Sequence, residues 1–100
     1  MSKNKNALNK SLKNEYIKVP NKILEIRLDS NAVALYVFLL KQSEDFNPSL
    51  LYIQNNLKLS KPTIIKYLGE LENRNIIKRV YRGGLGKVSK YEFINPKEWK

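Results

Sequence analysis

Residues Asn47 to Tyr81 read NPSLLYIQNNLKLSKPTIIKYLGELENRNIIKRVY, a pattern that predicts two helices joined by a tight turn and followed by a strand. Ser49 suits the N-cap of the first helix and Ser60 that of the second, because a serine hydroxyl accepts hydrogen bonds from the free N–H groups of a helix start. Pro62 falls just inside the second helix, where its missing N–H does no harm. The turn is expected at Lys58–Leu59.

The second of these helices carries its apolar residues at helical spacing. Ile64, Leu68 and Leu71 stand at i, i+4 and i+7, which places them on one stripe that must face a core. A second helix that begins a few residues after the first, with a basic face near its N-terminus, is typical of a helix-turn-helix that binds DNA. The face opposite the stripe is expected to be exposed and to carry Lys61, Thr63, Lys66, Tyr67 and Glu70.

Composition excludes several classes of protein. The 100 residues contain no cysteine and no histidine, which removes disulfides, thiol nucleophiles, imidazole bases and the usual zinc ligands. The nine acidic residues are scattered, so we expect no enzyme, no metal site and no cofactor. The longest apolar run, Ala32 to Leu40, is too short to span a bilayer, and the basic N-terminus lacks the apolar stretch of a secretory signal. We therefore expect one small cytoplasmic domain without membrane contact.

The net charge of +10 is concentrated in the second half of the chain. Residues 58–90 hold nine basic side chains against Glu70 and Glu72, a balance of +7, and residues 1–14 add four lysines. Positive charge clustered on the second helix and the segment after it indicates a surface for a polyanion. A solvated basic surface without a partner is the alternative that composition leaves open.

The segments before the helix pair divide into an arm and the start of a domain. Residues 1–15 are rich in lysine and asparagine and are expected to form a basic, disordered arm, whereas residues 16–100 form the folded domain. Tyr16 to Pro20 reads as a short edge strand that the proline ends. One helical turn is expected at residues 21–26. A helix is expected at about residues 31–42, capped by Asp29 or Ser30 and apolar on nearly all sides.

A β-hairpin is expected after the helix pair. Residues 76–81 and 88–94 are rich in β-branched and aromatic side chains that alternate with polar ones. Three glycines within residues 82–87 allow the positive φ angles that a hairpin turn requires. Trp99 follows the second strand, and we expect it to pack in the core.

The order of strand, helix, helix, turn, helix and glycine-tipped hairpin resembles the winged helix-turn-helix family. The passage LKLSKPTIIKYLGELENRNIIKR, Leu57 to Arg79, is similar to the turn, recognition helix and strand of that family. The segments VPNKILE and LDSNAVALYVFLLKQ resemble the N-terminal part of such proteins in Firmicute plasmids and phages. The resemblance implies an α+β fold with a three-helix core, a short N-terminal strand and a C-terminal β-hairpin wing. Gly69 departs from the pattern, in mid-helix, and close packing of this helix is the explanation that the sequence offers.

The resemblance and the charge pattern together select the residues expected to contact DNA. Lysines and free helix N–H groups would bind phosphates, while groups that reach base edges would read sequence. The expected sites are Ser60, Lys61, Thr63, Lys66 and Tyr67 on the helix, Arg82, Gly83, Gly84, Lys87 and Lys90 on the wing, and Lys58 and Lys78 as further phosphate contacts.

The wing is expected to contribute more base discrimination than is usual in the family. The predicted helix face has no arginine and carries Glu70, which repels phosphate, whereas Arg82 stands at the predicted hairpin tip. A planar guanidinium suits the narrow minor groove of A/T-rich DNA.

The sequence therefore predicts a site-specific protein for double-stranded DNA, A/T-rich at the wing contact. The resemblance implies a mobile element, in which the protein would mark an origin of conjugative transfer or replication. Its expected partners are a second copy of itself, because dimers read two half-sites, and a larger protein such as a relaxase, an initiator or a polymerase subunit. A repressor of a plasmid or phage operon and a winged-helix adaptor for an acidic protein are the alternatives.

Overall fold

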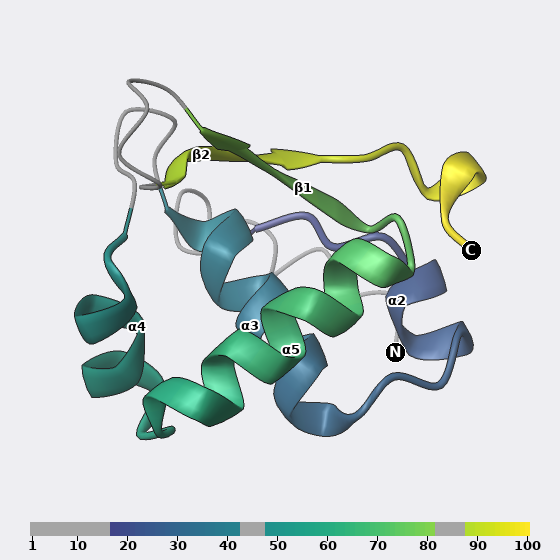
Figure 1. Ribbon diagram of the computed structural model, residues 1–100. Helices are drawn as coiled ribbons and strands as arrows, with labels where there is room; N and C mark the ends of the chain where they lie inside the picture. The colour runs from purple at the N-terminus through teal and green to yellow at the C-terminus, as the bar shows by residue number, and fades with distance from the viewer. Residues whose placement is uncertain (1–16, 43–47, 82–87) are drawn as a thin grey trace, which may run out of the picture.

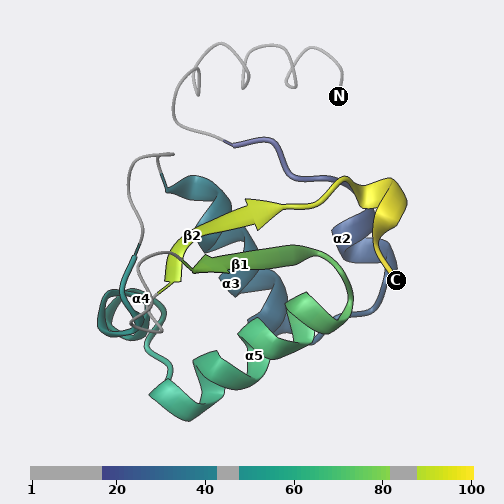
Figure 2. The same ribbon diagram turned by 45° about the horizontal axis from the view of Figure 1, so that its top comes forward.

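The computed structural model describes residues 17–42, 48–81 and 88–100, which form an α+β fold (Figure 1). The expected arm at residues 1–15 lies outside this part, as do Arg82, Gly83, Gly84 and Lys87. The hairpin lies across one side of the helices (Figures 1 and 2). The described elements are α2 (Lys22–Glu25), α3 (Ser30–Lys41), α4 (Leu50–Leu57), α5 (Lys61–Asn73), β1 (Ile77–Tyr81), β2 (Val88–Phe93) and the 3₁₀ turn η1 (Pro96–Glu98).

The longer helices begin at the polar caps predicted from the sequence. Ser49 Oγ accepts a hydrogen bond from the N–H of Tyr52 at 3.1 Å, and Ser60 Oγ accepts one from the N–H of Thr63 at 3.4 Å. Of the two residues considered for α3, Asp29 is the cap, since its carboxylate accepts from the Asn31 N–H at 2.9 Å. Each contact satisfies an N–H that has no partner within the helix.

The turn between α4 and α5 is three residues long and depends on a left-handed residue. Lys58 has φ 58° and ψ 39°, and its N–H closes α4 by donating to the Gln54 carbonyl at 2.8 Å. Leu59 packs against the core, and Ser60 caps α5. The turn therefore brings the end of α4 directly to the start of α5, and the two helices run in different directions (Figures 1 and 2).

The core confirms the apolar stripe of α5 and the placement of Trp99. Tyr36 of α3 stands at its centre, with ring centroids 5.7 Å from Trp99 and 6.0 Å from Phe93, both in edge-to-face geometry. Such pairs are favoured by the quadrupoles of the rings and join α3 to β2 and to the C-terminal segment. The buried apolar residues are Ile23, Ala32, Leu35, Tyr36, Leu39, Ile53, Ile64, Tyr67, Leu68, Leu71, Ile76, Ile77 and Trp99.

The predicted hairpin is present as an antiparallel pair with alternating faces. Ile77 opposes Phe93 and Arg79 opposes Tyr91 on the face toward the helices. The other face carries the exposed Lys78 opposite Glu92, and Val80 opposite Lys90. Side chains alternate because successive residues of a strand point to opposite sides of the sheet. A register shift follows Val80, next to the predicted turn.

The strand predicted for residues 16–20 is wrong over its described part. The sheet formed by the described residues has two strands, β1 and β2, and residues 17–20 are not paired into it. Proline cannot donate to a ladder, and the Pro20 carbonyl instead accepts from the Ile23 N–H at 3.1 Å, which starts the turn into α2. Val19 contributes by packing its side chain against the core.

Candidate nucleic-acid interface

The start of α5 is stabilised by a hydrogen bond between a serine and a threonine side chain. Ser60 Oγ lies 2.8 Å from Thr63 Oγ1, in addition to its contact with the Thr63 N–H. Thr63 is half-buried and engaged in this cap, so its hydroxyl supports the helix start more directly than it reads a base. Pro62 has no N–H and that of Thr63 is bonded to Ser60, so within this first turn it is the Lys61 N–H and the helix dipole that favour an anion.

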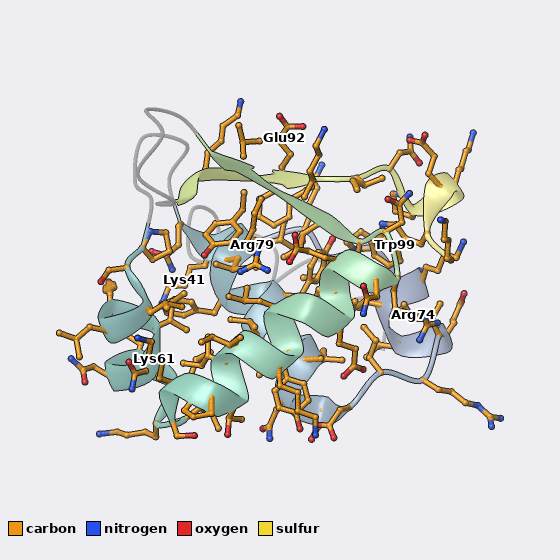
Figure 3. The ribbon with its side chains drawn as sticks, in the orientation of Figure 1. Lys41, Lys61, Arg74, Arg79, Glu92 and Trp99 are labelled. Carbon is orange, nitrogen blue, oxygen red and sulfur yellow. The ribbon has the colours of Figure 1, made fainter. Side chains whose placement is uncertain are left out.

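Three of the predicted lysines surround this helix start. Lys58 in the turn, Lys61 in the first turn of α5 and Lys66 one turn later are all exposed. Within residues 17–42, 48–81 and 88–100, none of them forms an ion pair with a carboxylate; the ion pair there joins Arg79 to Glu72. Figure 3 shows Lys61 at the α4 end of the molecule. We call Lys58, Lys61 and Lys66 the helix lysines.

The prediction that Tyr67 is exposed is wrong. Its side chain is only 7% exposed and belongs to the core. Tyr67 follows Ile64 by three residues and precedes Leu71 by four, so it shares their side of the helix and widens the apolar stripe. From there it cannot reach a base edge. Its role at the surface is indirect, since Lys66 Nζ lies 5.3 Å from the centre of its ring, within range of a cation–π contact.

The predicted lysines of the hairpin form a second group. Lys78 and Lys90 are exposed on the face of the hairpin that points away from the helices. Glu92, directly across from Lys78, reduces the local positive charge. Figure 3 labels Glu92 on this outer face and Lys61 at the start of α5, so the described lysines predicted to contact DNA fall into two groups.

Two arginines of the basic segment have structural partners. Arg79, on the inner face of the hairpin, forms its ion pair with Glu72 of α5 and thereby joins β1 to that helix. Arg74, at the C-cap of α5, donates through Nε to the Lys100 carbonyl at 2.6 Å and through Nη2 to the Ile26 carbonyl at 3.2 Å. Both guanidiniums therefore join separate elements of the fold.

The turn end of the hairpin and the start of α5 lie on the same side of the molecule, with α4 between them (Figure 1). Figures 1 and 2 both place the end of β1 at Tyr81 and the start of β2 at Val88 on the α4 side of the molecule, where α5 also begins. The opposite side holds α2, η1 and the last described residues. The turn residues Arg82, Gly83, Gly84 and Lys87, predicted to form the wing contact, lie outside the described part.

Sequence reasoning missed Ile65 and misread Gly69. Ile65 is 45% exposed, one of the most exposed large apolar side chains among the described residues. Among the described residues, no atom outside the backbone of α5 lies within 4 Å of where a Cβ of Gly69 would stand, so the expected close packing is wrong. Helical spacing contained the signal, because Ile65 lies about 100° around the helix from Ile64 and Gly69 is its i+4 neighbour.

Metal-binding clusters and membrane-spanning helices are both absent from the described residues. They contain no group of three or more His, Cys, Asp or Glu side chains placed to bind a metal ion. No helix among them has the length and apolar character needed to cross a membrane.

Comparison with known proteins adds no relative. A scan against protein-family models and a search of the curated proteins found no match to this chain. The resemblance to winged helix-turn-helix proteins therefore stays a prediction from the residues themselves.

Proposed function

We propose that the protein binds double-stranded DNA at specific sites as a winged helix-turn-helix protein, with α5 in the major groove. The arrangement that supports this is α4, a three-residue turn, α5 and an antiparallel hairpin that follows after Arg74–Ile76. An α-helix fits the width of the B-DNA major groove, and the second helix of such a pair is the one that enters it.

The helix lysines carry this proposal. Lys58, Lys61 and Lys66 are exposed and form no ion pair in the described part of the chain, and they lie near the end of α5 that the helix dipole makes positive. Phosphate contacts release the counterions condensed on DNA and supply most of the affinity. The same positive surface would also attract an acidic protein, which is therefore the competing occupant.

The hairpin turn is the second contact that we propose. Arg82 and Lys87 would enter the minor groove beside the site of α5, where a narrow A/T-rich groove attracts guanidinium. The exposed Lys90 on β2 would contact the adjoining phosphates, and Lys78 would do so from β1. Two copies of the chain would bind as a homodimer to two half-sites.

The process that we propose is the marking of an origin of transfer or replication on a mobile element. Its basis is the resemblance of residues 19–25 and 28–42 to proteins of plasmids and phages. The bound protein would recruit a relaxase, an initiator or a polymerase subunit. Mapping its sites on the element separates this role from transcription control, since a repressor would cover a promoter.

The salt dependence of duplex binding tests the role of the helix lysines. For the variants Lys58→Gln, Lys61→Gln and Lys66→Gln we expect weaker binding, because each substitution removes a cation from the surface that faces phosphate. The slope of log K against log salt should become shallower by about 0.9 for each phosphate that is no longer neutralised. Fluorescence anisotropy with a labelled duplex between low and moderate salt measures both quantities. Lys97→Gln is the matched control, because Lys97 is exposed in η1 on the opposite side of the molecule.

An unchanged slope in all three variants would contradict the placement of α5 against phosphates. Should the wild-type protein form no saturable complex with any duplex of a mobile element or of a random pool, DNA binding itself fails. The adaptor role would then be the better explanation of the basic surface.

A further inference from the structure

The exposed face of α5 has an apolar centre. Pro62, Ile65 and Gly69 follow one another at spacings of three and four residues, which places them in a row along one side of the helix. The exposed Lys61 and Lys66 stand on either side of this row. With Ile65 at 45% exposure, the row offers its largest apolar group between two cations.

Neither Ile65 nor Gly69 improves the helix or the core. Isoleucine is a poorer helix former than alanine because its branched Cβ is restricted, and glycine is poorer still because it is flexible. Apart from the backbone of α5 itself, no atom of the described residues lies within 4 Å of a Cβ added to Gly69, so no neighbouring element among them requires its small size. Both residues are better explained by contact with a molecule outside the described chain.

The flanking charge indicates which molecule this is. Two lysines without ion pairs in the described residues stand beside the row and favour a polyanion, and the row lies on the face that the proposed function directs into the major groove. The C5-methyl of thymine is the apolar group that the major groove displays. At Gly69, one turn beyond Ile65, no side chain would hold the helix away from the groove floor.

The side chains that usually form hydrogen bonds with bases in the major groove are missing from residues 61–69 of α5. Residues 61–69 contain no arginine, asparagine or glutamine, and Tyr67 is buried. Thr63 is engaged with Ser60, so Lys61 and Lys66, which flank the row, are the exposed polar side chains left among residues 61–69. Readout by α5 must therefore depend largely on apolar contact.

We propose that Ile65 is a specificity-determining residue that packs on the C5-methyl of thymine in the major groove. This inference rests on the proposed DNA binding and adds to it the chemical group that α5 recognises. Thymine would be distinguished from uracil at the same position by that one methyl. Lys61 and Lys66 would position the helix by contacting phosphates on the two sides of the groove.

Deoxyuridine substitution isolates the methyl group without changing base pairing. A duplex is first selected from a random pool with the wild-type protein, and each thymine in it is then replaced singly by deoxyuridine. At one or two positions we expect the wild-type affinity to fall about fourfold, the equivalent of about 0.8 kcal/mol for one buried methyl. Ile65→Ala should show no such reduction at those positions.

Leu24→Ala is the matched control for Ile65→Ala. Leu24 is an apolar side chain that is 77% exposed on α2, on the other side of the molecule from α4. The Leu24→Ala variant should retain the fourfold sensitivity to deoxyuridine that Ile65→Ala lacks. Because both changed side chains are exposed, thermal unfolding is expected to show that both variants fold.

Several outcomes would overturn the inference while leaving DNA binding in place. These are a selected site whose binding is insensitive to deoxyuridine at every thymine, or an equal sensitivity in the wild type and Ile65→Ala. Loss of self-association in Ile65→Ala, with deoxyuridine sensitivity unchanged, would assign the row to an interface between two copies of the chain. A wild-type protein that selects no duplex overturns the proposed function itself.

Discussion

Lys58 occupies a backbone conformation that glycine adopts with less strain. Its φ of 58° lies in the left-handed region, which costs a side chain roughly 1 kcal/mol or more. Its side chain is exposed and forms no ion pair that would offset this strain within the described residues. A cation retained at such a position is consistent with a contact to phosphate beside the start of α5.

We therefore expect Lys58→Gly to change stability and binding in opposite directions. Relief of the left-handed strain should raise the free energy of unfolding by about 1 kcal/mol, while duplex affinity falls. Urea denaturation and anisotropy on the same preparation measure the two effects. Asn75→Gly is a control, because Asn75 also has φ 58° but lies at the opposite end of α5 from the helix lysines. An equal decrease of DNA affinity in both variants would contradict a phosphate contact by Lys58.

Some residue roles could be predicted from the sequence and others could not. Ser49, Ser60 and Asp29 act on N–H groups two or three residues away, so the sequence contains both partners of each contact. The prediction of an exposed Tyr67 is wrong although its spacing from Ile64 and Leu71 places it beside the apolar stripe, because the width of a buried stripe depends on what packs against the helix.

At the scale of the elements, α5 combines a well-capped start with an unfavourable middle. Ser60 and Pro62 favour initiation, whereas Gly69 lies on the exposed face, where a good helix former would be more stable. The hairpin that follows is anchored by the Arg79–Glu72 ion pair and by Ile77 in the core. Packing against the hairpin and the core therefore stabilises α5, although residues on its exposed face have low helix propensity.

Gly69→Ala should stabilise the protein. The added methyl meets open space, and alanine has a helix propensity up to about 1 kcal/mol more favourable than glycine. Chemical denaturation should show an increase of that order in the free energy of unfolding. Ala34→Gly, at an exposed position of α3, is the reverse change and should destabilise by a similar amount. A destabilised Gly69→Ala would mean that this part of α5 packs against a second copy or another element.

Element prediction succeeded where spacing alone decides structure. The helix boundaries and both hairpin strands follow from local periodicity, caps and turn residues. The segment at residues 17–20 has β-branched residues but no strand partner among the described residues. A strand forms only when a second segment pairs with it, and the sequence of one segment does not determine whether that happens.

At the scale of the whole molecule, the C-terminal segment ties the helices and the hairpin together. Trp99 packs edge-to-face on Tyr36, and its Nε1 donates to the Ile94 carbonyl at 2.8 Å. Arg74 holds the last residue and the end of α2, and Figure 3 shows Arg74 and Trp99 on the same side of the molecule. Many of the contacts between distant segments therefore lie on the side of the molecule away from the helix lysines.

Trp99→Ala should be strongly destabilising. Removal of a buried aromatic leaves a cavity beside Tyr36 and typically lowers the free energy of unfolding by about 3 to 5 kcal/mol. Urea unfolding followed by circular dichroism measures the change. Lys97→Ala, an exposed position two residues earlier, should be nearly neutral. A decrease below about 1 kcal/mol would show that the segment is not part of the cooperative core.

The sequence by itself determined the α+β class, the helices with their caps, the hairpin and the concentration of positive charge. These depend on contacts between residues near one another in the chain or on a direct count of side chains. The tertiary structure decided that Tyr67 is buried, that Arg74 and Arg79 join elements, and that Ile65 remains exposed between two lysines. Burial and long-range pairing depend on which helix and strand surfaces pack against each other, and these contacts exist only in the folded molecule.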